Sequence, residues 1–327
     1  KISIGGENKM DKTVSFGNLS AGAGQIVREW LQVPGVSFSI PATLICGRTD
    51  GPTVLVSGGI HSCEYVGIQA AVALSQQLTP QEIHGALLLL HPVNPVGFQA
   101  RTASLVPTDG RNLNREFPGS EQGSESQRLA HFFVTEIYPK LDFYLDLHGG
   151  EIFENLSPYV YFGAAGSKEV EERAKKAAQC INVPYMVRSL AKTGAYNYAG
   201  IMGVPSLLLE RGCAGTWTPQ EVEEDIQDVR RVLAHLGMLD HAPRQSQVPK
   251  LVTEVLYQKP NTPGLWYPQV QAGDFVRYGQ PIGVVRDYWG KELERYTAPY
   301  NGVVLYLTRT LWADDFIELF TIAKLEK

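Results

Sequence analysis

The stretch TVLVSGGIHSCE, residues 53–64, predicts a short buried strand that ends at two glycines. After the turn, His61 and Glu64 stand three positions apart, so one metal ion could bind both the imidazole and the carboxylate. An HxxE spacing alone often arises by chance, and most such pairs are surface residues. The spacing becomes informative only if further metal-binding side chains reach the same place.

Two further apolar segments end in such side chains, one in His148 and the other in Glu210. In open α/β sheets the C-terminal ends of the strands form the crevice in which ligands bind. Two histidines and one glutamate with an open fourth position form the ligand set of a catalytic zinc ion, and a further glutamate suits a general base. We therefore expect one zinc ion per chain, bound by His61, Glu64 and His148, with Glu210 as the catalytic base.

The alternatives are a structural zinc site and a cysteine nucleophile. Closed structural sites favour several thiolates, and Cys46, Cys63, Cys180 and Cys213 show no CxxC spacing. Cys63 stands two positions after His61, but the metal requires that imidazole. Scattered cysteines are typical of buried apolar residues in a reducing compartment, so we expect a cytoplasmic protein without disulfides.

Composition narrows the classes of function. The chain has 327 residues, 44% of them hydrophobic and 19% charged, which is typical of a globular protein with a sizeable core and a smaller domain. A net charge of −5 argues against a general nucleic-acid binder, and no apolar run approaches the ~20 residues that span a membrane. Residues 1–5 lack the apolar segment of a signal peptide, although the chain does not begin with Met and a removed signal stays open.

From residue 53 to about 240, β-rich runs alternate with helical patterns, which predicts an α/β sheet with helices on its faces. The clearest helix signal is the capping box at 218–221, with Pro219 at the first helical position and Gly237 at the end. Residues 1–52 mix short strands and turns. The expected strands are 53–57, 86–91, 142–147, 159–163 and 205–210, and the expected helices are 63–77, 124–138, 167–181 and 219–236.

A polar, proline-containing linker at 241–249 divides the chain into a catalytic domain, 1–243, and a C-terminal β-domain, 244–327. The second part shows short strands and turns without a long helical period, and it is similar to biotinyl or lipoyl carrier domains. It has no carrier lysine motif, so we interpret it as a cap over the cleft. Tyr300 is a candidate cleft-facing residue, and the alternative is an ordinary surface tyrosine of a turn. The strands expected there are 270–276, 281–285, 302–307 and 316–322.

Several motifs then identify a family resemblance. They are NPVGFQAR at 94–101, PTDGRNLNREFPG at 107–119, DLHGG at 146–150 and LLLERG at 207–212, besides the HxxE. In this order they resemble the succinylglutamate desuccinylase/aspartoacylase family of zinc-dependent deacylases, a branch of the zinc carboxypeptidase clan. The resemblance covers about 50 to 325. It implies a zinc-carboxypeptidase-like mixed sheet flanked by helices, with a smaller all-β, barrel-sandwich-like C-terminal domain.

The resemblance also assigns roles to residues outside the metal set. Asn114 and Arg115 match the pair that holds the free carboxylate of the substrate. Arg101 matches the arginine that polarises the scissile carbonyl, and Arg111 is a further candidate for contacting an acidic group. A surface salt bridge is the alternative for Arg101 and Arg115.

Two features near the ligands bear on the site. Asp146 stands two positions before His148 and could orient a ligand imidazole, or it could be a buried strand residue satisfied by backbone donors. The family usually has Gly-Asp or Gly-Asn between the first histidine and glutamate, whereas this chain has Ser62 and Cys63. The departure leaves the ligands intact and puts the choice of substrate in doubt.

We therefore expect a hydrolase that cleaves the amide bond of a small N-acyl amino acid, with no nucleic-acid or membrane partner. The sequence leaves open whether the protein forms a homo-oligomer. The alternatives are a zinc carboxypeptidase acting on short peptides and a binding protein on a degenerate hydrolase fold. A C-terminal domain that leans over the cleft would exclude long substrates, whereas an open groove would favour peptides.

Overall fold

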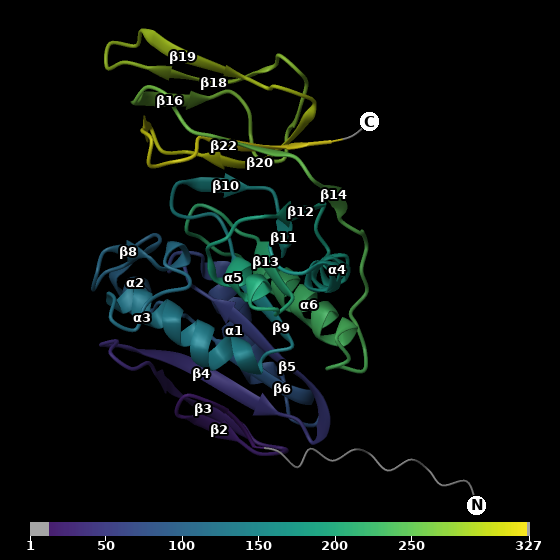
Figure 1. The fold of residues 1–327 in the computed structure, drawn as a ribbon. Helices are drawn as coiled ribbons and strands as arrows, with labels where there is room; N and C mark the ends of the chain where they lie inside the picture. Colours follow the sequence, from purple (N-terminus) through teal and green to yellow (C-terminus); the bar gives the residue numbers. More distant parts are fainter. Residues whose placement is uncertain (1–12, 326–327) are drawn as a thin grey trace, which may run out of the picture.

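The computed structural model describes residues 13–325, and a nine-stranded mixed sheet forms its centre (Figure 1). The expectation for residues 1–5 lies outside the described residues. The strand order is β14-β12-β11-β13-β9-β5-β6-β4-β3, with β13, β9, β5 and β6 parallel in the middle. The strands are β3 (Ile26–Gln32), β4 (Ser39–Cys46), β5 (Thr49–Gly58), β6 (His84–Leu90), β9 (Phe143–His148), β11 (Tyr159–Gly163), β12 (Tyr185–Ser189), β13 (Ser206–Glu210) and β14 (Lys250–Val252).

Both faces of the middle of this sheet are buried, and successive side chains of a strand point to opposite faces. In β5, Val54 and Val56 pack into one core together with α1, α4 and α6, and Leu55 packs into the other core with α3 and α5. The helices are α1 (Tyr65–Gln77), α2 (Pro95–Ala100), α3 (Glu125–Phe132), α4 (Lys168–Ala178), α5 (Ala195–Ile201) and α6 (Pro219–His235). The predicted α/β class with a flanked mixed sheet is confirmed.

Most of the expected elements are present, with one subdivision. At the start of α6 the Thr218 hydroxyl accepts a hydrogen bond from the Glu221 backbone N–H, 3.2 Å away, as the capping box predicts. The helix expected over 124–138 is instead α3 followed by a π-helical turn, Phe133–Ile137, and a 3-10 turn, Tyr138–Lys140. Within residues 13–325, no helix combines the length and the apolar character needed to cross a bilayer.

Two glycines bring the first motif close to the centre of the sheet. Gly59 has a φ of 77°, and a Cβ there would lie 2.5 Å from Pro92. Gly67 lies on α1, where a Cβ would come within 2.6 Å of the Leu147 Cβ on β9. The turn after β5 therefore places the start of α1 beside the end of β9.

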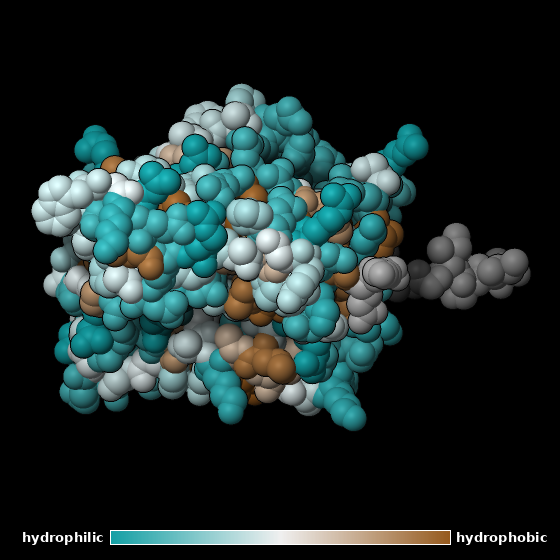
Figure 2. All heavy atoms as spheres, turned by 90° about the horizontal axis from the view of Figure 1, so that it is seen from above, coloured by the Kyte–Doolittle hydropathy of each residue, from teal (hydrophilic) through white to brown (hydrophobic). Residues whose placement is uncertain are grey.

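The C-terminal part consists of two small sheets, β10-β20-β22-β15 with β17 beside β20, and β19-β18-β16-β21. Trp266, Val276 and Phe320 belong to the core between them. Seen from above, hydrophobic residues on this side of the molecule form separate spots among hydrophilic ones (Figure 2). The strands are β10 (Glu154–Leu156), β15 (Val255–Gln258), β16 (Gly264–Pro268), β17 (Phe275–Val276), β18 (Pro281–Arg286), β19 (Glu292–Thr297), β20 (Gly302–Thr308), β21 (Trp312–Ala313) and β22 (Phe320–Lys324). Two short hairpins complete the chain, β1 (Val14–Phe16) with β2 (Leu19–Ala21) and β7 (Leu105–Val106) with β8 (Arg111–Asn112).

The two parts of the chain exchange strands at their junction. The strand β10 comes from the middle of the chain, yet it pairs with β20, and in Figure 1 it lies directly beneath the C-terminal sheets. Conversely, β14 lies beyond the expected boundary at 243/244 but still pairs with β12 in the large sheet. The chain passes from one sheet to the other at Thr253 and Glu254. The strand expected over 316–322 begins only at Phe320, because the preceding residues form a loop.

Candidate active site

A cavity of about 610 Å³ lies at the C-terminal ends of β5, β9 and β13. The four residues expected to carry the chemistry line it: His61, Glu64, His148 and Glu210. A larger cavity of about 800 Å³ lies elsewhere, between α3 and the turns of β1–β2 and β3–β4, and contains none of these four residues. The residues that the sequence predicts to carry the chemistry therefore all line the smaller cavity.

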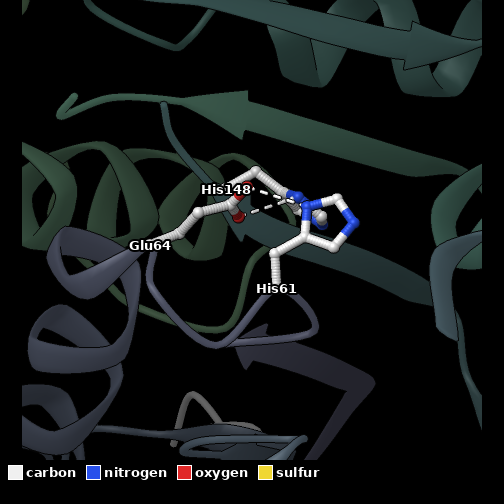
Figure 3. Close-up of side chains that lie close together, drawn as sticks. All are labelled: His61, Glu64 and His148. Atoms are coloured by element: carbon white, nitrogen blue, oxygen red, sulfur yellow. Dashed lines mark hydrogen bonds and ion pairs between the residues drawn. The ribbon is translucent and has the colours of Figure 1, made fainter. Parts of the chain in front are cut away.

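The three expected metal ligands lie together, and all three are buried (Figure 3). One oxygen of Glu64 lies 2.8 Å from His61 Nδ1 and the other lies 3.0 Å from His148 Nδ1. The two imidazole rings are nearly perpendicular, and one ligand atom from each residue lies within 4.8 Å of the others.

This arrangement fits a metal ion. Glu64 Oε2 is buried without a hydrogen bond of good geometry, although His148 Nδ1 is close. Burial alone would raise the pKa of Glu64, but the charges of His148 and His61 outweigh burial and lower the pKa to about 2. A divalent cation placed among the buried carboxylate and the two imidazole nitrogens would satisfy all three ligand groups.

His148 is held from behind by Asp146. Asp146 Oδ2 lies 3.0 Å from His148 Nε2, and Asp146 Oδ1 accepts a hydrogen bond from the Ser57 hydroxyl at 2.6 Å. The expected contact between this carboxylate and the imidazole is present, and it leaves Nδ1 to face Glu64. Burial would lower the pKa of His148, but Asp146 and Glu64 together raise it well above its ordinary value.

Asn112 plays a similar part at His61 and was not anticipated from the sequence. Its side-chain oxygen lies 3.2 Å from His61 Nε2 and also accepts from the Asn114 backbone N–H at 2.9 Å. The only signal was its place in the DGRNLNR segment.

Glu210 ends β13 directly opposite His148, its register partner on β9. Burial, followed by the nearby Glu64 carboxylate, raises the pKa of Glu210 well above its ordinary value. A carboxyl group with a raised pKa can both take up and release a proton near neutral pH. The position and electrostatics of Glu210 therefore suit a base.

The residue after Glu210 anchors this strand end. Arg211 is buried and donates to Asp225 at 2.6 Å and to Asp228 at 2.8 Å, both on α6. Its backbone N–H donates to the His148 carbonyl at 3.1 Å. One buried ion-pair cluster thus ties the ends of β9 and β13 to α6.

Asn114 and Arg115 line the same cavity, as expected. They lie in a 3-10 turn, Leu113–Arg115, and the Asn114 side-chain oxygen accepts from the Ala195 backbone N–H at 2.8 Å. Arg115 is exposed, and its guanidinium donates to the Asn114 carbonyl at 3.3 Å. Their placement agrees with a role in substrate binding, which stays a prediction.

Arg101 and Arg111 do not line this cavity. Arg101 is exposed at the end of α2 with a φ of 57°, and it lines a separate hollow of about 360 Å³ beside Phe98 and Trp217. Arg111 is exposed and forms an ion pair with Glu116 at 3.2 Å. The roles predicted for both arginines therefore require a rearrangement on substrate binding, and they stay predictions.

Tyr300 also differs from its expected position. It packs against the core of the C-terminal sheets, and its hydroxyl donates to the Ile322 carbonyl at 3.0 Å. It does not line the cavity, because its turn faces the β-domain core.

An acidic and aromatic part of the lining carries no signal in the sequence motifs. Glu151 lies 3.6 Å from His61 Nδ1, and Glu154 accepts hydrogen bonds from the Tyr306 hydroxyl and the Glu151 backbone N–H, both at 2.9 Å. Burial, followed by the Glu151 carboxylate, raises the pKa of Glu154 to about 7. Residues of the C-terminal part complete the lining: Tyr257, Lys259, Tyr306, Phe316, Ile317, Glu318 and Thr321.

Comparisons with known proteins agree with this picture. The model of the succinylglutamate desuccinylase/aspartoacylase catalytic domain matches residues 50–236. The chain is 30% identical over 275 residues to the N-α-acetyl-L-2,4-diaminobutyric acid deacetylase of Halomonas elongata, which covers 81% of this chain and 80% of the relative. A succinylglutamate desuccinylase/aspartoacylase structure from Rhodobacter sphaeroides has a TM-score of 0.83 at 25% identity, covering 98% of this chain and 100% of that one. The product-bound ectoine utilization protein EutE (DoeB) from Ruegeria pomeroyi has a TM-score of 0.82 at 23% identity, covering 92% and 95%.

The fold, the site and the curated relative together define a hydrolase acting on amide bonds. The match of the family model to more than half of the chain makes the identification specific. The protein belongs to the succinylglutamate desuccinylase/aspartoacylase family.

Proposed function

We propose that the protein is a zinc-dependent amidohydrolase that removes the acyl group from a small N-acyl amino acid. The observation that carries this proposal is the convergence of His61, Glu64, His148 and Glu210 in one cavity that Arg115 also lines. By its name, the relative from Halomonas elongata deacetylates N-α-acetyl-L-2,4-diaminobutyric acid. An acetylated short diamino acid is therefore the first substrate to test.

His61, Glu64 and His148 would hold the zinc ion, which when bound lowers the pKa of water and polarises a carbonyl group. Glu210 takes a proton from the attacking water at its carboxylate and returns it to the leaving amine. Arg115 and Asn114 bind the free carboxylate of the amino acid, because a planar guanidinium matches a carboxylate at two points. Asp146 keeps the imidazole of His148 in one orientation through their 3.0 Å contact.

The C-terminal part acts as a cap in this proposal. Tyr257, Tyr306 and Phe316 all belong to it and line the same cavity as the metal ligands. A wall at this place favours short substrates, and it argues against the carboxypeptidase alternative, which needs room for an extended peptide.

The test is a substrate panel with zinc-loaded protein. We expect release of the free amino acid from N-acetyl and N-succinyl amino acids, with kcat/KM well above that for matched tri- and tetrapeptides. Comparable kcat/KM values for acyl amino acids and peptides would refute the cap and favour a carboxypeptidase. No hydrolysis of any member of the panel would refute the proposed activity.

A further inference from the structure

The active-site cavity carries more carboxylates than cations. Among the described residues, its lining contains five glutamates, one arginine, one lysine and the two metal-site histidines: Glu64, Glu151, Glu154, Glu210, Glu318, Arg115, Lys259, His61 and His148. Glu64 belongs to the metal site and Glu210 is the proposed base. Glu318 interacts favourably with the charges of Lys259 and Arg115. Glu151 and Glu154 form the remaining acidic surplus.

Glu154 is held firmly in place. One oxygen of its carboxylate accepts from the Tyr306 hydroxyl and the other from the Glu151 backbone N–H. Its own carbonyl accepts from the Ala214 N–H at 2.8 Å, so main chain and side chain are both fixed. A carboxylate oriented in this way can receive a substrate group without reorganising.

The charge of Glu154 lacks a basic partner in the part of the chain that the structure describes. Within residues 13–325, no Lys or Arg lies at ion-pairing distance from it, and its charged neighbours include Glu151 and Glu64, both acidic. Its pKa is therefore raised to about 7, by burial first and then by Glu151. A largely buried carboxylate without a counter-ion is unfavourable, and a positively charged ligand would relieve this cost.

The cavity also offers aromatic surface beside these carboxylates. Tyr159 and Tyr161 pack edge to face with ring centroids 5.1 Å apart, and Tyr196 lies 6.3 Å from Tyr161. All three line the cavity, together with Tyr257 and Tyr306. The face of an aromatic ring attracts a cation, so tyrosines next to a carboxylate suit an ammonium group.

We propose that Glu154, held by Tyr306, binds a positively charged group in the side chain of the substrate. The enzyme then selects N-acyl derivatives of short diamino acids over neutral or acidic ones. This inference rests on the proposed function, in which the metal site takes the acyl carbonyl and Arg115 takes the α-carboxylate. The amino-acid side chain is the part of the substrate left for Glu154.

A matched pair of substrates tests the proposal. In N-acetylnorvaline a methyl group replaces the terminal ammonium of N-α-acetyl-2,4-diaminobutyrate, and the length is unchanged. We expect the wild type to prefer the cationic substrate by roughly 10- to 150-fold in kcat/KM, the range for a hydrogen bond to a charged group. Glu154→Gln should remove most of this preference, because kcat/KM should fall for the cationic substrate and stay unchanged for N-acetylnorvaline. Tyr306→Phe, which keeps the ring, should reduce it in the same direction.

A binding measurement separates this inference from the proposed reaction. Calorimetric titration with free 2,4-diaminobutyrate and with norvaline needs no turnover, and Glu154→Gln should weaken only the diamino acid. Glu254→Gln serves as the control, because Glu254 is exposed and pairs with Lys324. Equal losses on both substrates, or equal binding of both amino acids to the wild type, would overturn the assignment of Glu154. If the wild type binds diaminobutyrate selectively but hydrolyses no N-acyl amino acid, only the proposed reaction fails.

Discussion

The floor and the roof of the cavity are built differently. The floor consists of the ends of β5, β9 and β13, where His61, Glu64 and His148 are at most 8% exposed and bonded to buried partners. The roof comes from the C-terminal sheets and from β10, and its loop residue Phe316 is 88% exposed. Under the proposed function, the buried floor would carry out the chemistry and the exposed roof would determine which molecules reach it.

The largest expected effect comes from breaking the floor at a metal ligand. His148→Ala or His61→Ala removes one of three donors, so zinc content measured by elemental analysis should fall to background and activity with it. His131→Ala on α3 is the control, because His131 lies in the other cavity. Full zinc occupancy in both ligand variants would show that the ligand set is wrong.

The Glu210→Gln variant tests whether this floor residue transfers a proton or binds the metal. The variant should keep its zinc and lose about 10²- to 10⁴-fold in kcat, the range for a positioned general acid–base group. Zinc content and single-turnover rates measure the two effects separately. Loss of zinc would make Glu210 a ligand, and near-normal turnover would exclude it as the base.

The sequence predicted the floor far better than the roof, for a physical reason. His148 and Glu210 end their strands, and His61 and Glu64 lie in the turn between β5 and α1, so local patterning alone places all four at one edge of the sheet. The contact between Glu154 and Tyr306 joins residues 152 positions apart and depends on the pairing of β10 with β20. No local pattern indicates that a three-residue segment joins a distant sheet.

Arg115 lies between the floor and the roof, and Arg115→Ala tests whether it binds the free carboxylate of the substrate. We expect kcat/KM for a free-acid substrate to fall by about 30-fold, or ~2 kcal/mol, because a hydrogen bond to a charged group is lost. The corresponding methyl ester should be little affected. Arg295→Ala is the matched control, since Arg295 is an exposed arginine that pairs with Glu292 outside the cavity. Equal losses on acid and ester would show that Arg115 does not bind the carboxylate.

The smallest effect on activity is expected for Phe316, the exposed loop residue of the roof. Phe316→Ala removes an exposed ring, so folding stability should change by no more than ~0.5 kcal/mol. The ratio of kcat/KM for tripeptides to that for N-acyl amino acids should rise, because the entrance widens. Tyr278→Ala, an exposed aromatic outside the cavity lining, should leave the ratio unchanged. An unaltered ratio in Phe316→Ala would remove this residue from size selection.

The pairing of β10 with β20 also has a consequence for biosynthesis. A chain that emerges from the ribosome N-terminus first contains β10 long before its partner strand exists, which makes this a contact of high sequence separation. Until residues 302–308 arrive, the edge of β10 is unpaired and open to strands of other chains. The pairing with β20 therefore removes an open strand edge, and the same C-terminal part completes the cavity lining.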